Sequence, residues 1–126
     1  MADGLLPATA VVLVANGAGD ARSRELPPNP VFADFMGRQL MPWLKAQGIA
    51  AGPERTVIAG SSYGGLASSY VALRYPQWFG NVLSLSGSYW WAPKGESPNW
   101  LARQYEQAPQ LPIRFYFDAG LYEGAR

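Results

Sequence analysis

Five residues near the middle of the chain restrict its fold more than any other segment. Residues 60–64 match the pattern G-x-S-x-G, and they lie between a short apolar run and a stretch with helical spacing. The pattern requires a sharp turn from a strand into a helix, with the serine held in a strained backbone conformation. We expect Gly60 and Gly64 to be needed because a Cβ at either position would collide with the neighbouring chain. The sequence therefore predicts a strand, a tight turn and a helix of an α/β fold.

Apolar runs alternate with helical segments along the rest of the chain. The predicted strands are residues 10–15, 56–59, 81–86 and 113–119. The predicted helices are residues 30–47, 66–75 and 98–107. This order is typical of parallel βαβ units, so we expect a mostly parallel sheet with helices on both faces. No internal boundary is visible, and residues 1–126 are treated as one domain.

The first predicted helix has clear signals at both ends. Asn29 is a candidate N-cap before Pro30, and Gly48 is a plausible stop. Pro42 should kink the last turn of this helix or end it early. Helical spacing places Phe35 and Trp43 in the core. For the last predicted helix the expected cap is Ser97.

The composition excludes several function classes. The 126 residues contain no cysteine and no histidine, and their net charge is +1. A disulfide framework and thiolate chemistry are therefore excluded, and the commonest general base and metal ligand is missing. The small net charge argues against nucleic-acid binding. The longest apolar run, residues 10–15, is too short for a membrane span or a signal peptide. We expect a cytoplasmic protein without a metal or cofactor, with the periplasm as the alternative location.

The turn at residues 60–64 makes Ser62 the candidate nucleophile. The helix that follows would direct its free N–H groups toward the serine, so the Tyr63 N–H is the expected oxyanion donor. A glycine-rich turn can also serve packing or phosphate binding. That alternative is weaker here because no lysine follows the glycines, as it would in a P-loop.

Two longer patterns are more specific than this turn. One is an R-x-x-E-L type loop before Asn29, in the region of Arg22, Arg24, Glu25 and Leu26, and the other is the ending SGSYWW of the strand at residues 81–86. With these patterns, residues 24–44 and 54–91 closely resemble the enterochelin esterase family of esterase-D-like α/β-hydrolases. The resemblance implies a three-layer α/β-hydrolase sandwich. It also implies hydrolysis of the ester bonds of a catecholate siderophore such as ferric enterobactin, with release of iron after uptake.

The resemblance places the acid of the catalytic triad at Glu123, in a G-x-x-E context after the last predicted strand. Asp118 is the rival, but it lies within that strand, where it would cap or pair with a neighbour. The family's histidine lies C-terminal to the acid, and its first strands and second oxyanion donor would precede Met1. We therefore expect a partial catalytic domain that is inactive alone. A natural pseudo-enzyme is the alternative.

Four further residues are candidates for binding the substrate. Arg22 and Arg24 follow the first predicted strand and would suit an anionic ferric catecholate, although pairing with Asp20 or Glu25 explains them equally well. Tyr89 and Trp90 could stack on catechol rings, or they could pack against the next helix. The competing functions are another esterase or an acyltransferase of the same superfamily, and a siderophore-binding protein without catalysis.

Overall fold

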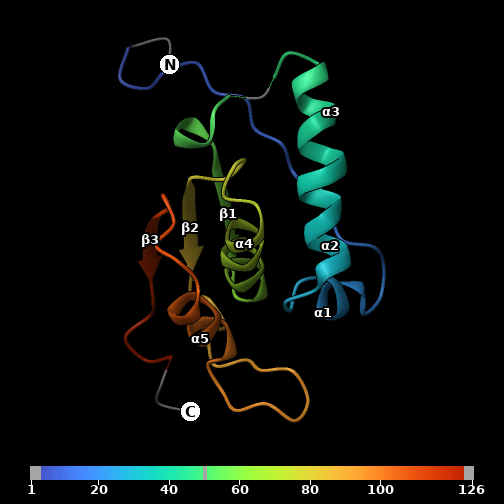
Figure 1. Ribbon diagram of the computed structural model, residues 1–126, viewed down its shortest axis with the longest axis vertical. Helices are drawn as coiled ribbons and strands as arrows, with labels where there is room; N and C mark the ends of the chain where they lie inside the picture. The colour runs from blue at the N-terminus through green and yellow to red at the C-terminus, as the bar shows by residue number, and fades with distance from the viewer. Residues whose placement is uncertain (1–3, 50, 124–126) are drawn as a thin grey trace.

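The computed structural model describes residues 4–49 and 51–123 of the chain (Figure 1). The regular elements that precede β1 are all helical in the described residues. In chain order, they are α1 (Ala21–Glu25), α2 (Pro30–Asp34), the π-helical η1 (Phe35–Leu40), α3 (Met41–Ala46) and the 3₁₀ turn η2 (Pro53–Arg55). Strands and helices then alternate as β1 (Val57–Ser61), α4 (Tyr63–Arg74), β2 (Asn81–Leu85), α5 (Trp100–Gln107) and β3 (Arg114–Asp118).

The strands form one parallel sheet in the order β1-β2-β3. Val57 pairs with Asn81, and Asn81 pairs in turn with Arg114, so all three strands begin at the same level. Their carboxyl ends therefore meet at one edge, where α/β folds carry their sites. The parallel α/β fold predicted from the sequence is confirmed.

One face of the sheet carries the core. Ile58, Val82 and Ser84 are buried on this face, and α4 packs against it. The helices of both halves contribute to the same apolar cluster, including Met36, Leu66 and Leu101. The opposite face is open, since Val57 is 59% exposed. The second helical layer of a three-layer sandwich is not found among residues 4–49 and 51–123.

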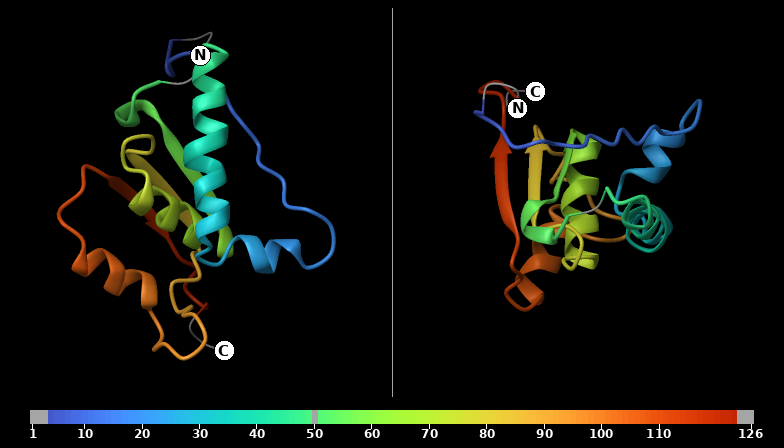
Figure 2. Two further views of the ribbon diagram at one scale, coloured as in Figure 1. Left: turned by 45° about the vertical axis from the view of Figure 1, so that its right-hand side comes forward. Right: turned by 90° about the horizontal axis from the view of Figure 1, so that it is seen from above.

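The expectation of a strand at residues 10–15 is wrong. In Figure 2 this segment passes the long helix without forming a helix or a strand, and it pairs with none of the described strands. Val11 is 74% exposed and Leu13 is 90% exposed. An open hollow of about 850 Å³ lies between the segment, the α2–α3 helix and β1. An apolar run becomes a strand only where a neighbouring strand takes up its N–H and C=O groups, and no strand of the described residues does so here.

The α2–η1–α3 segment forms one long helix, and its signals at both ends are confirmed. The Asn29 side chain accepts hydrogen bonds from the N–H groups of Val31 and Phe32, at 2.9 and 3.4 Å. Gly48, just past the helix, has a φ of 75°, in the left-handed region that favours glycine. The helix does not end early at Pro42 but continues to Ala46.

The π-helical turn explains two further differences from the expectation. The Met41 N–H bonds to the Met36 carbonyl, five residues back, so the wide turn lies directly before Pro42. The wider turn also changes which residues face inward. Met36 and Met41 are buried, whereas Phe35 and Trp43 are 38% and 57% exposed, so their placement in the core is wrong. Spacing based on 3.6 residues per turn fails across a π-helical turn.

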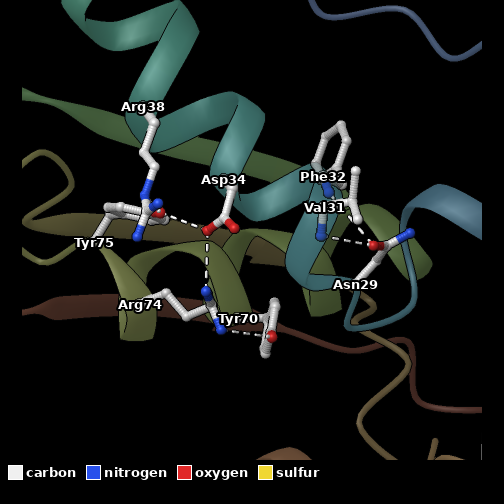
Figure 3. Close-up of polar contacts among 8 residues, drawn as sticks. All are labelled: Asn29, Val31, Phe32, Asp34, Arg38, Tyr70, Arg74 and Tyr75. Atoms are coloured by element: carbon white, nitrogen blue, oxygen red, sulfur yellow. Dashed lines mark hydrogen bonds and ion pairs between the residues drawn. The ribbon is translucent and has the colours of Figure 1, made fainter.

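A polar cluster joins this long helix to α4 (Figure 3). The Tyr75 hydroxyl donates to Asp34 at 2.5 Å and accepts from Arg38 Nε at 3.0 Å. Arg74 forms an ion pair with the same Asp34 oxygen at 3.0 Å. The cluster therefore fixes α4, which begins directly after the candidate nucleophile Ser62, against the α2–α3 helix. None of the helices in the described part of the chain is long and apolar enough to cross a membrane.

Candidate active site

Ser62 lies between β1 and α4, at the carboxyl edge of the sheet. Its backbone has φ 56° and ψ −120°, a region that residues with a Cβ rarely occupy. Its N–H donates to the Leu85 carbonyl at 2.9 Å, and its side chain is exposed. The predicted strand–turn–helix unit is therefore present. The helix begins at Tyr63, three residues earlier than the sequence indicates.

The turn depends on glycine at Gly60, but the expectation for Gly64 is wrong. A Cβ on Gly60 would overlap the Gly64 backbone. A Cβ on Gly64 would meet no atom of the described residues within 4 Å. Gly65 is the second constrained position, because a Cβ there would overlap Ser84 Oγ. The closest packing in this strand–turn–helix unit is thus between the turn and the start of α4, and between the start of α4 and β2.

Tyr63 occupies the first position of α4, where a backbone N–H has no acceptor within the helix. This N–H group follows Ser62 directly, as an oxyanion donor would. The Tyr63 ring packs against the ring of Trp90, with the ring centres 6.1 Å apart. The hollow of about 850 Å³ is lined by Ser61 and Gly64 but not by Ser62 or Tyr63. We therefore place the candidate chemistry at the exposed turn and not in this hollow.

The loop after β2 lies against Ser62, the candidate nucleophile. The Ser88 N–H donates to the Ser62 carbonyl at 3.1 Å, and the two side-chain oxygens lie 3.2 Å apart. Ser88 is only 4% exposed. Sequence reasoning missed this residue, although the parallel sheet brings the ends of β1 and β2 together. The signal was its place in the SGSYWW segment directly after β2.

Both candidate acids contact Ser86, which has a φ of 49°. Its hydroxyl donates to Glu123 Oε1 at 2.5 Å, and its N–H donates to Asp118 Oδ1 at 2.9 Å. Glu123 Oε1 also accepts from the Gly120 N–H at 2.6 Å. Asp118 is the last residue of β3, and Glu123 lies beyond it. The two carboxylates thus lie at the carboxyl edge that carries Ser62.

The two candidate arginines lie in the short helix α1 and not in an irregular loop. Arg22 donates to the Ser61 carbonyl at 3.2 Å, next to the candidate nucleophile Ser62. Arg24 pairs with Asp20 at 3.1 Å, and both side chains are largely exposed. Arg22 therefore lies beside the turn, whereas Arg24 makes the local ion pair that was the alternative explanation.

The two candidate aromatic residues differ in their surroundings. The Tyr89 hydroxyl lies 2.8 Å from Ser69 Oγ and donates to Ser84 Oγ at 2.7 Å. Its ring meets Phe117 edge-on, with the ring centres 5.5 Å apart. Trp90 is 62% exposed. Tyr89 is thus anchored in the packing between α4 and the sheet, and Trp90 presents its ring to solvent.

The arrangement combines an exposed serine, an N–H donor at a helix start and two carboxylates. It contains no imidazole, because the 126 residues have no histidine. A serine hydroxyl is a weak nucleophile unless a base accepts its proton. The described residues therefore offer a candidate serine nucleophile, and none of the 126 residues is a histidine that could act as its base.

Comparison with known proteins relates the whole chain to one family. Residues 2–125 match the family model described as "Putative esterase". The chain is 35% identical over 122 residues to the iron(III) enterobactin esterase of Escherichia coli K12. The aligned region covers 94% of this chain and 30% of that protein. The chain is 41% identical over 91 residues to the protein of the same name from Dickeya dadantii, covering 71% of this chain and 21% of the other.

A solved structure supports the same relationship. The enterobactin esterase of Shigella flexneri, crystallised in the presence of 2,3-dihydroxy-N-benzoyl-serine, superposes with a TM-score of 0.72 at 34% identity. The match covers 85% of this chain and 29% of that protein. The chain thus spans less than a third of the length of the relatives that it matches.

Proposed function

The chain belongs to the esterase family, and we propose that it supplies the nucleophile side of a serine esterase that hydrolyses a catecholate siderophore. The observation that carries this proposal is the conformation of Ser62. Ser62 has a positive φ, lies between the end of β1 and the start of α4, and is exposed to solvent. Such a strained turn is characteristic of a serine nucleophile on an α/β sheet. The relatives named iron(III) enterobactin esterase support the substrate class.

The proposed reaction proceeds in two steps. Ser62 Oγ attacks the ester carbonyl carbon while a base takes the serine proton, and the Tyr63 N–H stabilises the negative charge on the carbonyl oxygen. The carbon–oxygen bond to the alcohol breaks, and the alcohol leaves with that proton. Water then attacks the acyl-serine with the help of the same base. The products are the carboxylic acid and free Ser62.

We propose that the base is a histidine outside these 126 residues and that Glu123 orients it. Glu123 lies beyond the end of β3, where a triad acid can reach a histidine carried on another loop. The Asp118 carboxylate accepts the Ser86 N–H, a contact that supports a structural role for this residue. Within the triad, the acid holds the imidazole in one tautomer and stabilises its charged form.

The proposed substrate contacts lie around the exposed turn. Arg22 adjoins Ser61 and could move to bind an anionic ferric catecholate by a charge-assisted hydrogen bond. Trp90 offers an exposed ring for stacking on a catechol, beside Tyr63. Arg24 and Tyr89 are weaker candidates because both are engaged in local contacts. We propose the cytoplasm as the location, where hydrolysis would release iron after uptake, and no cofactor for the reaction.

The test uses the protein translated from the whole reading frame that contains this sequence, which we call the reading-frame product. It should hydrolyse ferric enterobactin, measured by chromatography of the released fragments, and the Ser62→Ala variant should not. The isolated 126-residue chain should be inactive toward a p-nitrophenyl ester because it has no histidine. Equal turnover by Ser62→Ala, or turnover by the isolated chain that depends on Ser62, would contradict the proposal.

The same measurements separate the competing functions. Hydrolysis of simple esters without hydrolysis of enterobactin would indicate another esterase of this family. Transfer of the acyl group to an added alcohol in preference to water would indicate an acyltransferase. Binding of ferric enterobactin without any turnover would indicate a siderophore-binding protein that has lost catalysis.

A further inference from the structure

Ser88 is a buried hydroxyl that the proposed reaction does not use. It is 4% exposed, and its Oγ lies 3.2 Å from Ser62 Oγ. A buried hydroxyl without a hydrogen bond is costly, so the contact with Ser62 is part of what makes this burial tolerable. Ser88 is thereby linked directly to the atom that would attack the substrate.

The backbone around Ser88 holds this hydroxyl in place. The Ser88 N–H donates to the Ser62 carbonyl at 3.1 Å, so the loop and the turn are joined by main chain as well as by side chain. Gly87 precedes it, and a Cβ there would overlap the Tyr89 ring. Ser86, one residue earlier, has a positive φ. The loop after β2 is thus bent and closely packed, and it leaves the Ser88 hydroxyl little freedom.

The Ser62 side chain needs such a partner because the turn itself exposes it. An exposed serine populates several staggered χ1 rotamers unless a contact selects one. A nucleophile that occupies several rotamers reaches the attacking geometry only part of the time. The hydrogen bond described for the Ser62 hydroxyl joins it to the Ser88 hydroxyl, and either group can be the donor.

We infer that Ser88 is a positioning residue that holds Ser62 Oγ in one rotamer for attack. This inference rests on the proposed function of Ser62 as the nucleophile. Ser88 acts through Ser62 and exchanges no proton with the substrate. Its loss should therefore lower kcat and leave KM and the pH dependence of kcat nearly unchanged.

The experiment compares Ser88→Ala with Ser68→Ala in the reading-frame product. Ser68 is also buried, at 3% exposure, and its hydroxyl donates to the Gly64 carbonyl at 2.8 Å without contacting Ser62. Ser88→Ala should lower kcat roughly two- to tenfold, the range of one net hydrogen bond, with KM within twofold. Ser68→Ala should lower the melting temperature about as much as Ser88→Ala does, but it should leave kcat within twofold.

A second measurement decides the inference even if the protein does not hydrolyse esters. Crystal structures of the wild-type reading-frame product and of Ser88→Ala should show Ser62 Oγ in one rotamer and in several, respectively. A single unchanged Ser62 rotamer in Ser88→Ala would overturn the inference, as would equal losses of kcat in the two alanine variants. Absence of turnover in the wild type would refute the proposed function, and the rotamer measurement would still decide the role of Ser88.

Discussion

Ser62 and Ser86 are residues with a Cβ that adopt positive φ values at the same edge of the sheet. Such conformations cost of order 1–3 kcal/mol each and persist only where the surrounding structure enforces them. Here the enforcing contacts are hydrogen bonds, from the Ser62 N–H to Leu85 and from Ser86 to the two carboxylates. The strain therefore lies at Ser62, the proposed nucleophile, and at Ser86, which contacts both candidate acids.

The first prediction separates the two acids. In the reading-frame product, Glu123→Gln should lower kcat by roughly a hundredfold or more, because the imidazole would lose its orienting carboxylate, with little change in stability. Asp118→Asn should instead lower the melting temperature and leave kcat within a few-fold, because this carboxylate accepts the Ser86 N–H between β2 and β3. Turnover and thermal unfolding are measured on both variants. If Asp118→Asn abolishes turnover in a stably folded protein and Glu123→Gln does not, the two roles are exchanged.

The second prediction concerns the glycines of the turn. Gly60→Ala should destabilise the 126-residue chain by about 1–3 kcal/mol, because its Cβ would overlap the Gly64 backbone. Gly64→Ala is the matched control. Its Cβ meets no described atom within 4 Å, and alanine favours the helix by about 0.5–1 kcal/mol, so stability should stay constant or rise. Thermal unfolding at low protein concentration measures both, and equal losses would contradict this account.

At the scale of elements, the long helix is tied to α4 by the cluster around Asp34. The hydrogen bond from Tyr75 is the largest cause of a lowered pKa of Asp34, acting against desolvation, and Arg74 lowers this pKa further. A carboxyl group with a lowered pKa in the folded protein stabilises the fold above its ordinary pKa. That contribution is lost as the pH falls below about 4 and through the lowered value.

The third prediction tests this cluster. Tyr75→Phe removes the hydroxyl that joins Arg38 to Asp34, and it should cost about 1 kcal/mol of unfolding free energy at neutral pH. The difference from the wild type should narrow as the pH falls below about 4, because Asp34 then becomes protonated in both proteins. Tyr70→Phe is the control, since the hydrogen bond described for the Tyr70 hydroxyl is a long one, at 3.5 Å from Arg74. Chemical denaturation over a pH series measures the effect, and a difference that is independent of pH would contradict it.

The elements also show where sequence reasoning holds and where it fails. The strand–turn–helix around Ser62 and the Asn29 cap were predictable, because local hydrogen bonds and glycine sterics determine them. Ser97 was the wrong cap for α5. The residue before this helix is Asn99, which has a left-handed backbone conformation and makes no side-chain capping hydrogen bond. The strand predicted at residues 10–15 failed because a strand also needs a partner, which no local pattern specifies.

The positions of the candidate site residues could be predicted only in part. Ser62 and Tyr63 follow from the turn, whereas Ser88 became visible only when the parallel register brought the ends of β1 and β2 together. The side-chain partners of Tyr89 and Arg24 could not be read from the sequence either. Loop residues find their partners through the packing of distant segments, so for such residues a sequence offers alternatives and no choice between them.

At the scale of the whole molecule, the sheet is open at β3. All five residues of this strand are exposed, and in the described structure the strand pairs only with β2. Its apolar side chains include Tyr116, 63% exposed, and Phe117, 56% exposed. An exposed apolar edge strand presents free N–H and C=O groups to other chains and is a site of association.

The last prediction follows from this edge. The purified 126-residue chain should form dimers or larger species at micromolar concentrations by pairing along β3, measured by analytical ultracentrifugation. Tyr116→Lys should shift the chain toward the monomer, because a charge on an edge strand opposes pairing with a second copy. Val11→Lys is the matched control, since it adds the same charge at a position that is 74% exposed and lies outside the described sheet. It should leave the association unchanged. An equal shift in both variants would show that net charge, and not the β3 edge, controls the association, and no shift in Tyr116→Lys would exclude β3 as the interface.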